Sequence, residues 1–266
     1  MSIIEFNNVS QAFFVDRKKK SAKVALDHVT FAIEEGEFVS LLGPSGCGKT
    51  VSLSMMAGFC SPMLGTVSFK GEPIDEPGPE RGVVFQEYSL FPWLTAKQNV
   101  AFSVRNACKA AGEPLSKSQI EARACKALAT VGLGDALDAR PNTLSGGMKQ
   151  RVAIARLLAM DSEVFLMDEP FSALDEQTRH SLDENLIAIW KKHRKTIVFV
   201  THNISEAILV SSRILLYSAS PGTIIGEWRL DDGFDRNPQS SESIALADEI
   251  RSLMPSNSCE FLLDEG

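Results

Sequence analysis

The sequence has few of the features that mark secreted, zinc-stapled or membrane-embedded proteins. Its five cysteines are odd in number and scattered, and no C-x-x-C pair occurs, so neither a disulfide framework nor a zinc ribbon is indicated. The first residues, M-S-I-I-E-F-N-N, do not resemble a signal peptide. No apolar run approaches the ~18 residues that a membrane-spanning helix needs. These absences favour a reducing compartment and restrict any role at a membrane to a peripheral one.

An excess of positive charge is also absent. The formal net charge of −7 argues against a general nucleic-acid-binding protein. The basic run D-R-K-K-K-S-A-K at residues 16–23 is interpreted as a solvated turn between two strands; contact with acidic lipid head groups is the alternative. No internal repeat occurs. The 266 residues, 44% of them hydrophobic, suffice for one large domain with a substantial core.

Short apolar runs predict the strands of an α/β fold. The runs cover residues 37–42, 83–85, 164–167 and 197–200. The first ends at a glycine-rich loop, and Gln86, Asp168 and His202 lie at or just past the ends of the other three. In an open parallel sheet, ligands bind beyond the carboxyl ends of the strands. The sequence therefore predicts a site where this loop and these polar side chains meet.

The rest of the chain predicts one more strand region and a set of helices. Residues 3–14 form a predicted strand that is broken by Asn7 and Asn8. Between residues 87 and 160 the pattern becomes helical, with a predicted helix at 116–131. The tail from residue 237 contains a predicted amphipathic helix, with an apolar face made of Ile244, Ala247, Ile250 and Met254.

The clearest motif is G-P-S-G-C-G-K-T at residues 43–50, which matches the phosphate-binding pattern G-x-x-x-x-G-K-[ST]. It follows an apolar strand and precedes a predicted helix at 51–57, a context that disfavours a chance glycine-rich turn. Glycines let backbone N–H groups converge on phosphate oxygens, and the helix start adds its positive dipole end. We predict that Lys49 reaches the β- and γ-phosphates and that the Thr50 hydroxyl binds Mg²⁺. The predicted nucleotide-binding residues here are Gly43, Pro44, Ser45, Gly46, Cys47, Gly48, Lys49, Thr50 and Val51.

Side chains at the predicted strand ends supply the remaining chemistry. Asp168 can hold Mg²⁺, directly or through water, and Glu169 beside it can polarise an attacking water. Paired acids could instead cap the following turn, an alternative that the phosphate-binding loop disfavours. Gln86 offers an amide to Mg²⁺ or to the attacking water, and His202 can donate to a γ-phosphate oxygen. We predict that the catalytic residues are Lys49, Gln86, Glu169 and His202, that the metal ligands are Thr50, Gln86 and Asp168, and that His28, His180 and His193 are structural.

A second possible anion cradle, L-S-G-G-M-K-Q-R, lies at residues 144–151. It contains no catalytic acid, base or metal ligand. With this element present, the chain resembles the ATPase subunit of an ATP-binding-cassette (ABC) transporter over residues 1–235. The resemblance rests on the order and spacing of G-P-S-G-C-G-K-T at 43–50, V-V-F-Q at 83–86, L-S-G-G-M-K-Q-R at 144–151, V-F-L-M-D-E-P at 164–170, S-A-L-D at 172–175 and V-T-H at 200–202.

The resemblance implies a P-loop NTPase core with a mixed or parallel sheet. It adds an N-terminal antiparallel β part, an α-helical subdomain inserted at about residues 87–160, and a short helical tail at 236–266. It also implies ATP and Mg²⁺ as cofactors. Two positions differ from the commonest family pattern: Met148 replaces a glutamine and Asn203 an aspartate. Neither change removes a predicted catalytic group, so we expect activity to be intact.

The resemblance further implies a head-to-tail dimer, of two copies or with a second ABC ATPase, that sandwiches two ATP molecules. Each ATP would lie on the P-loop of one copy and under the L-S-G-G element of the other, contacted by Ser145, Gly146 and Gly147. A serine hydroxyl and glycine N–H groups at a helix start suit a γ-phosphate. Asp175 would join the two sites across the interface. Phe13, with Phe14 as the alternative, would stack on adenine.

Three finer patterns are similar to the nitrate/taurine/sulfonate branch of bacterial importers: residues 85–95, 99–102 and 218–224. This branch implies two transmembrane permease subunits, a periplasmic or lipid-anchored substrate-binding protein, no nucleic acid, and a peripheral location on the cytoplasmic face of the inner membrane. Tyr88, Phe91, Pro92 and Trp93 are interpreted as the groove that receives a helix of a permease subunit, with a core role as the alternative. The cargo stays open among nitrate, taurine, alkanesulfonates and thiamine-precursor-like compounds.

Other functional classes fit less well. Mechanical ATPases of chromosome maintenance or DNA repair separate their motifs by long coiled coils, for which Gln86 and Ser145 are too close. Translation-type cassette proteins usually carry two cassettes per chain, and this chain has one. A P-loop metabolic kinase is disfavoured by the L-S-G-G element. Another transporter branch, export by a related system and a soluble non-transport ABC ATPase remain alternatives.

Overall fold

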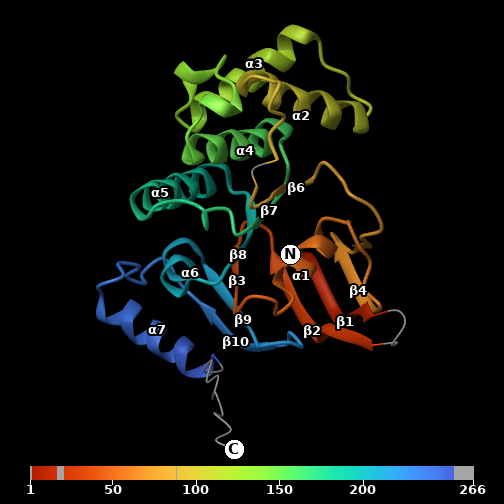
Figure 1. Ribbon diagram of the computed structural model, residues 1–266, viewed down its shortest axis with the longest axis vertical. Coiled ribbons are helices and arrows are strands. Elements are labelled where there is room, and N and C mark those ends of the chain that lie inside the picture. Colours follow the sequence, from red (N-terminus) through yellow and green to blue (C-terminus); the bar gives the residue numbers. More distant parts are fainter. Residues whose placement is uncertain (1, 17–20, 88, 255–266) are drawn as a thin grey trace, which may run out of the picture.

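Two β-sheets and a set of helices make up the structure (Figure 1). The computed structural model describes residues 2–16, 21–87 and 89–254. Within that part of the chain, the larger sheet has six strands in the order β10(Ile224–Arg229), β9(Arg213–Tyr217), β3(Phe38–Leu42), β8(Thr196–Thr201), β7(Val164–Asp168) and β6(Arg81–Val84). All neighbours pair in parallel except β10 and β9, which are antiparallel. The predicted α/β class with a mixed sheet is confirmed.

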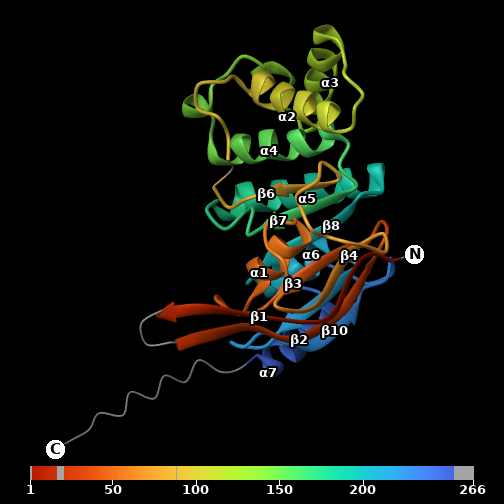
Figure 2. The ribbon, with the colours of Figure 1, turned by 90° about the vertical axis from the view of Figure 1, so that its right-hand side faces the viewer.

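The smaller sheet is antiparallel, with the order β2(Ser21–Glu34), β1(Ser2–Asp16), β4(Leu64–Phe69) and β5(Glu72–Pro73). Figure 2 shows β1 and β2 running side by side and projecting past the larger sheet. The predicted break at Asn7 and Asn8 is wrong, because the strand continues through a β-bulge in which these two residues oppose the single residue Thr30. Residues 17–20 of the predicted basic turn lie outside the described part.

The central strands of the larger sheet are buried on both faces, which explains their unbroken apolar runs. Alternate residues of β7 point to opposite faces. Val164 and Leu166 pack with α1(Lys49–Met56) and the antiparallel sheet, whereas Phe165 and Met167 pack with the helices on the other side. Burial on both sides fixes the strand ends in place, so the polar residues that follow them emerge at one edge of the sheet.

The helices fall into two groups in Figure 1. The helical subdomain at the top of that view consists of α2(Ala96–Ala110), α3(Lys117–Thr130) and α4(Gly146–Met160), with 3₁₀ turns at Gly134–Ala136 and Pro141–Thr143. Capping boxes start α2 at Thr95 and α3 at Ser116. Below it, α5(Glu176–His193) and α6(Ile204–Val210) pack against the larger sheet.

The tail helix forms as α7(Ser241–Leu253) and packs against α6 and β10. Its buried apolar side chains are Leu246, Ala247 and Ile250. Ile244 was expected on the buried face but is 48% exposed, so the apolar face is narrower than the sequence pattern indicates. The helix therefore extends the core of the domain with three side chains.

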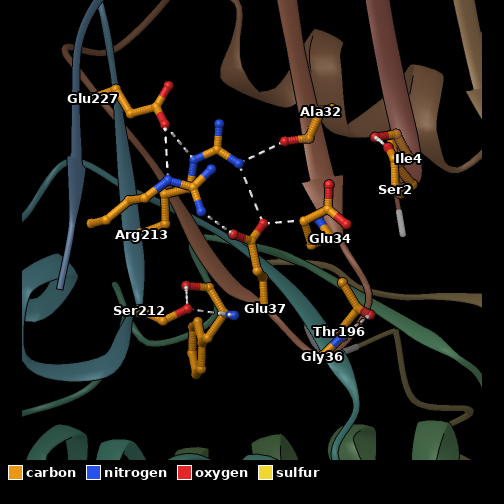
Figure 3. A network of polar contacts seen from close by, with 12 residues as sticks. Ser2, Ile4, Ala32, Glu34, Gly36, Glu37, Thr196, Ser212, Arg213 and Glu227 are labelled. Carbon is orange, nitrogen blue, oxygen red and sulfur yellow. Dashed lines mark hydrogen bonds and ion pairs between the residues drawn. The ribbon is translucent and has the colours of Figure 1, made fainter. Parts of the chain in front are cut away.

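A network of charged side chains ties four strands together at the end of β3 opposite the glycine-rich loop (Figure 3). The buried guanidinium of Arg213 donates to the carbonyl oxygen of Ala32 at 2.6 Å and pairs with Glu37 at 3.3 Å and Glu227 at 2.9 Å. Arg229 adds a second contact to Glu37 at 3.1 Å. Because removing one partner of a buried ion pair leaves an uncompensated charge, this network holds β2, β3, β9 and β10 in register.

Candidate nucleotide-binding and catalytic site

The glycine-rich loop between β3 and α1 forms a cradle of backbone N–H groups. Gly46 and Gly48 have φ angles of 76° and 100°, which glycine adopts readily. Gly48 is the N-cap of α1 and offers no side chain, so the first N–H groups of the helix have no side-chain cap. A Cβ atom at Gly48 would lie 2.5 Å from Leu26 Cδ2 and 2.7 Å from the Ala25 carbonyl oxygen. The loop thus suits an anion placed at the start of α1.

Lys49 lies folded across this loop. Its Nζ atom donates to the carbonyl oxygens of Gly43 at 2.7 Å and Pro44 at 2.8 Å, and lies 3.6 Å from Cys47 Sγ. The side chain is buried, so its charge is held within the cradle rather than in solvent. A phosphate oxygen could replace these carbonyl contacts without a large movement of the ammonium group.

A cavity of about 310 Å³ opens over the loop. Phe13, Lys23 and Ala25 from the antiparallel sheet line one side, and P-loop residues with Glu169 line the other. Phe13 lines the cavity and is 45% exposed, whereas Phe14 is 72% exposed and is not part of its wall. Lys23 was read only as part of a solvated turn; its place in the cavity depends on how β2 pairs with β1, which the sequence pattern alone does not show.

Thr50 and Asp168 bring two oxygen ligands together beside the cradle. Thr50 Oγ1 donates to Asp168 Oδ1 at 3.0 Å. Burial raises the pKa of Asp168, and the hydrogen bond from Thr50 opposes this rise. Mg²⁺ is commonly bound through one or two carboxylates together with phosphate oxygens and water, and this oxygen pair beside a phosphate cradle fits it. The amide of Gln86 does not join the pair; its Nε2 donates to Ser172 Oγ at 3.2 Å.

Glu169 and His202 meet at the ends of adjacent strands. His202 Nδ1 lies 3.3 Å from Glu169 Oε1. The Glu169 N–H donates to the Val200 carbonyl oxygen at 3.0 Å, and its φ of 43° is unusual for a non-glycine residue. Ser172 Oγ donates to the Glu169 carbonyl oxygen at 3.0 Å, so Gln86 is linked to Glu169 through one hydroxyl. Three of the four predicted catalytic residues thus lie along one chain of polar contacts.

Asn203 has a clear local role. Its side chain caps α6 by accepting from the Glu206 N–H at 3.2 Å, and its own N–H donates to Thr201 Oγ1 at 3.0 Å. Asparagine and aspartate are about equally good N-caps. Asparagine in place of the usual aspartate can therefore still cap the start of α6.

The second cradle is built at the start of α4. Ser145 is the N-cap, and its Oγ accepts from the Met148 N–H at 3.3 Å. A Cβ atom at Gly147 would lie 2.6 Å from Thr178 Cγ2 on α5, so any side chain here would have to displace Thr178. The side chain of Met148 packs onto the core of the helical subdomain. Among the described residues, the wall of the P-loop cavity includes none from 144–151, so the two cradles do not share one cavity within the chain.

The motif S-A-S-P-G-T-I at 218–224 braces the P-loop from behind. The Gly222 N–H donates to the Ala25 carbonyl oxygen at 2.9 Å, and its carbonyl oxygen accepts from the Asp27 N–H at 3.0 Å. A Cβ atom at Gly222 would lie only 2.0 Å from the carbonyl oxygen of Cys47. The sequence offered this motif only as a branch pattern, and its contact with the P-loop could not be read from it.

Comparison with known proteins agrees with this geometry. The family model described as "ABC transporter" matches residues 26–172, more than half of the chain. The chain belongs to the ABC transporter family. The nitrate import ATP-binding protein NrtD of Synechococcus elongatus is 45% identical over 221 residues, covering 83% of this chain and 78% of that protein. The bicarbonate transport ATP-binding protein CmpD of Synechocystis sp. is 43% identical over 226 residues, covering 85% and 78%.

A longer relative matches in part. The bicarbonate transport ATP-binding protein CmpC of Synechocystis sp. is 48% identical over 203 residues; the match covers 76% of this chain but 30% of CmpC. Among solved structures, a dimeric post-hydrolysis state of the ATP-binding cassette MJ0796 bound to ADP and Pi aligns with a TM-score of 0.73 and 30% identity, over 86% of this chain and 99% of that one.

The predicted ABC ATPase and its importer branch are thus confirmed, and the chain is an ATP-binding, ATP-hydrolysing cassette of a transport system. No helix in the described part of the cassette is long and apolar enough to span a membrane. The roles of individual site residues, the domain boundaries and the Mg²⁺ ligands stay predictions.

The cassette has an apolar groove between its helical subdomain and its core sheet. This groove, about 370 Å³, is lined by Phe59, Phe85 and Phe102 together with polar and aliphatic residues. Phe85 was expected within a buried strand, but β6 ends at Val84 and Phe85 is 39% exposed, stacked on Phe59 with ring centroids 5.9 Å apart.

The predicted docking segment lies beside this groove rather than in its wall. Phe91, Pro92 and Trp93 do not line it, so the role of this segment in receiving a permease helix stays a prediction. Phe91 instead contacts one residue of the wall, with its ring centroid 4.8 Å from that of Phe102. Tyr88 lies outside the described residues.

Proposed function

We propose that this cassette hydrolyses ATP at two composite sites of a head-to-tail dimer and thereby powers a bacterial importer of a small anion. One observation carries the proposal: each chain has two anion cradles, and among the described residues the wall of the P-loop cavity contains nothing from the Ser145 cradle. A second copy placed head to tail would bring its Ser145 cradle over the first P-loop. The alignment with a dimeric cassette bound to ADP and Pi supports this arrangement.

On the P-loop side, the residues divide the work as follows. Lys49 would exchange its carbonyl contacts for the β- and γ-phosphates. Phe13 would stack on adenine from the wall of the cavity. Thr50 and Asp168 would hold Mg²⁺, which when bound neutralises phosphate charge. Gln86 would be a third ligand or would orient the water, which requires it to turn away from Ser172.

Glu169 and His202 would act on the terminal phosphate. Glu169 polarises the attacking water as a general base. With Nδ1 directed to Glu169, His202 presents Nε2 to the γ-phosphate, and Nε2 would donate to a γ-phosphate oxygen when both ring nitrogens carry a proton. This division explains why one side chain at the end of β7 and one at the end of β8 are brought within 3.3 Å of each other.

The second copy completes the site. Its Ser145 hydroxyl and the N–H groups of Gly146 and Gly147 would donate to the γ-phosphate, as the free donors of a helix start do. Asp175, the N-cap of α5, would link the two sites across the interface. Loss of the γ-phosphate removes these contacts and loosens the dimer, which converts hydrolysis into movement of the two chains.

The groove and the relatives support the transport part of the proposal. Relatives named for nitrate import and for bicarbonate transport place small inorganic anions first among possible cargoes, with taurine and alkanesulfonates after them. In each copy of the cassette, the groove lined by Phe59, Phe85 and Phe102 would receive one helix from one of two permease subunits, because exposed aromatic side chains suit interface pockets. The cassette would then lie on the cytoplasmic face of the inner membrane, in a complex that includes a substrate-binding protein outside.

Uptake in cells that lack this gene tests the proposal. Labelled nitrate, bicarbonate, taurine and an alkanesulfonate are supplied in turn, and the deletion is complemented with the natural chain or with Glu169→Gln. We expect the loss of one anion's uptake, restored by the natural chain and not by the variant. Immunodetection controls for equal amounts of the two chains. Unchanged uptake of all four compounds would exclude these cargoes, and full rescue by Glu169→Gln would remove Glu169 from hydrolysis.

A further inference from the structure

A cluster of buried charged side chains lies behind the proposed catalytic pair. It consists of Arg179 and Asp183 on α5 and Glu206 on α6. Arg179 and Glu206 line a small cavity of about 40 Å³ whose other side is formed by Glu169 and His202. Both acidic residues are buried: Asp183 is 3% exposed and Glu206 is 8% exposed. Acidic side chains are rarely so buried without a specific reason.

One arm of this cluster reaches the turn before α5. Arg179 Nη2 donates to the carbonyl oxygen of Leu174 at 2.9 Å. The next residue is Asp175, which caps α5 by accepting from the Thr178 N–H at 2.9 Å. Arg179 therefore fixes the backbone directly preceding the side chain that the proposed dimer would place at its interface.

The other arm reaches the turn after β8. The buried carboxylate of Glu206 accepts a hydrogen bond from Thr201 Oγ1. Thr201 precedes His202, and its Oγ1 also accepts from the Asn203 N–H. Glu206 thus holds the backbone on both sides of His202. Through Arg179 and Glu206, the Asp175 turn and the His202 turn are anchored to the same buried cluster.

The charges in the cluster are unbalanced, because two carboxyl groups face one guanidinium. Burial raises the pKa of Asp183 to about 8, the charge of Glu206 adds to this rise, and Arg179 opposes it. Burial also raises the pKa of Glu206, opposed by the hydrogen bond from Thr201 and by Arg179 and His202. Asp183 is therefore mostly protonated at pH 7, which leaves one charged carboxylate, that of Glu206, in the field of the Arg179 guanidinium.

Other charged groups near the cluster are few. Glu184 on α5 faces Asp183, and Glu169 faces Glu206. On α4, which packs against α5, Arg151 is bonded to Ser181 Oγ at 3.3 Å. Within the described residues, Asp183 Oδ1 and Arg179 Nε have no hydrogen-bond partner although both are buried. Such unsatisfied groups are costly, so a cluster of this kind points to a role other than stability.

We propose that Arg179, Asp183 and Glu206 are positioning residues that hold the Asp175 turn and the His202 turn as one unit. The inference rests on the proposed function, in which Asp175 faces the second copy and His202 faces the γ-phosphate. Loss of the γ-phosphate would then be felt at the interface through two backbone turns that are anchored to side chains lining the same cavity. Deprotonation of Asp183 places a second negative charge beside Glu206, competes for Arg179 and weakens its hold on Leu174.

The pH profile of ATP hydrolysis by the assembled transporter tests this assignment. The variants are Asp183→Asn, which keeps the shape but cannot ionise, Glu206→Gln, and Asp135→Asn as an exposed control. At pH 7 we expect Asp183→Asn to hydrolyse ATP within about twofold of the natural chain. At pH 9, which is one unit above the pKa of Asp183, the natural chain should hydrolyse ATP up to about tenfold more slowly than Asp183→Asn. The ratio of ATP hydrolysis by Asp135→Asn to that by the natural chain should stay constant from pH 7 to pH 9.

Glu206→Gln supplies the second readout. At pH 7 it should lower kcat for ATP several-fold with an unchanged KM, because the P-loop is untouched, and Glu206→Asp should restore part of the loss. Two results would overturn the assignment. One is a ratio of ATP hydrolysis by Asp183→Asn to that by the natural chain that stays constant from pH 7 to pH 9. The other is a Glu206→Gln effect confined to KM. Thermal unfolding verifies that each variant is folded. Lys49→Ala distinguishes the two proposals, since retained activity in that variant would contradict the proposed function itself and not the cluster.

Discussion

Gly222→Ala tests the structural account of the P-loop most sharply, because it adds one methyl group at a position with no room. The added Cβ atom would lie 2.0 Å from the carbonyl oxygen of Cys47 and 3.2 Å from that of Ala25. Both neighbours are backbone atoms, which cannot rotate away as a flexible side chain does. The loop that binds phosphate, the β9–β10 turn, or both must therefore move.

The size of the effect follows from the cost of overpacking. Inserting a methyl group into a tightly packed site costs about 1–3 kcal/mol. If the displacement falls on the P-loop, ATP affinity decreases by about fivefold to about 140-fold, at 1.4 kcal/mol for each factor of ten. If it falls on the β9–β10 turn, the same free energy is lost from stability and affinity changes little.

Calorimetric titration with ATP and thermal unfolding of the same variant distinguish these outcomes. The matched control is Gly134→Ala, since no atom lies within 4 Å of its Cβ position. We expect weaker ATP binding for Gly222→Ala and no change for the control. A Gly222→Ala chain with natural ATP affinity and a natural Tm would refute the claim that this turn braces the P-loop.

Three further predictions concern the core, the second cradle and the groove. Tyr217→Phe leaves the buried Ser52 hydroxyl without its partner at 2.9 Å and should cost about 1–3 kcal/mol, seen as a Tm lower by several degrees; an unchanged Tm would contradict this. Gly147→Ala should keep ATP binding by the single chain but lower hydrolysis by the dimer at least about tenfold, because its Cβ meets Thr178; natural turnover would argue against a role in the composite site. Phe102 is 38% exposed in the groove, and Phe102→Asp should keep ATP hydrolysis by the purified chain but abolish uptake. Ile225 is 39% exposed on β10, outside the groove, and Ile225→Asp should leave uptake intact. Equal uptake by both variants would remove the groove as a docking site.

The parts of the fold that sequence could predict depend on local patterns. The strands of the larger sheet are buried on both faces, so each reads as an unbroken apolar run. The P-loop and the α4 start are set by glycine and N-cap positions within a few residues. The sequence predicted only that Glu169 and His202 lie at the same edge of the sheet. Their contact depends on the parallel pairing of β7 with β8, which puts Asp168 opposite Val200.

The parts of the fold and the site that the sequence did not predict depend on contacts between segments that are distant in the chain. Lys23 and Gly222 reach the P-loop from residues far away in the chain, and neither position carries a local signal for this. Phe85 looked like a core residue because it continues an apolar run, but the strand ends one residue earlier and the ring joins a groove wall. The bulge in β1 was mistaken for a break because a single extra residue and a true interruption use the same asparagine-rich pattern.

The composite site can be tested most directly with mixed dimers of defined composition. Chains with two different affinity tags are combined, purified in tandem and assayed for ATP hydrolysis. If each site uses Lys49 of one copy and Ser145 of the other, a Lys49→Ala chain paired with a Ser145→Arg chain retains one intact site and hydrolyses ATP. A doubly substituted Lys49→Ala/Ser145→Arg chain paired with a natural chain retains no intact site and should be inactive. The reverse pattern, an inactive first pair and an active second pair, would show that each chain works alone and would contradict the account.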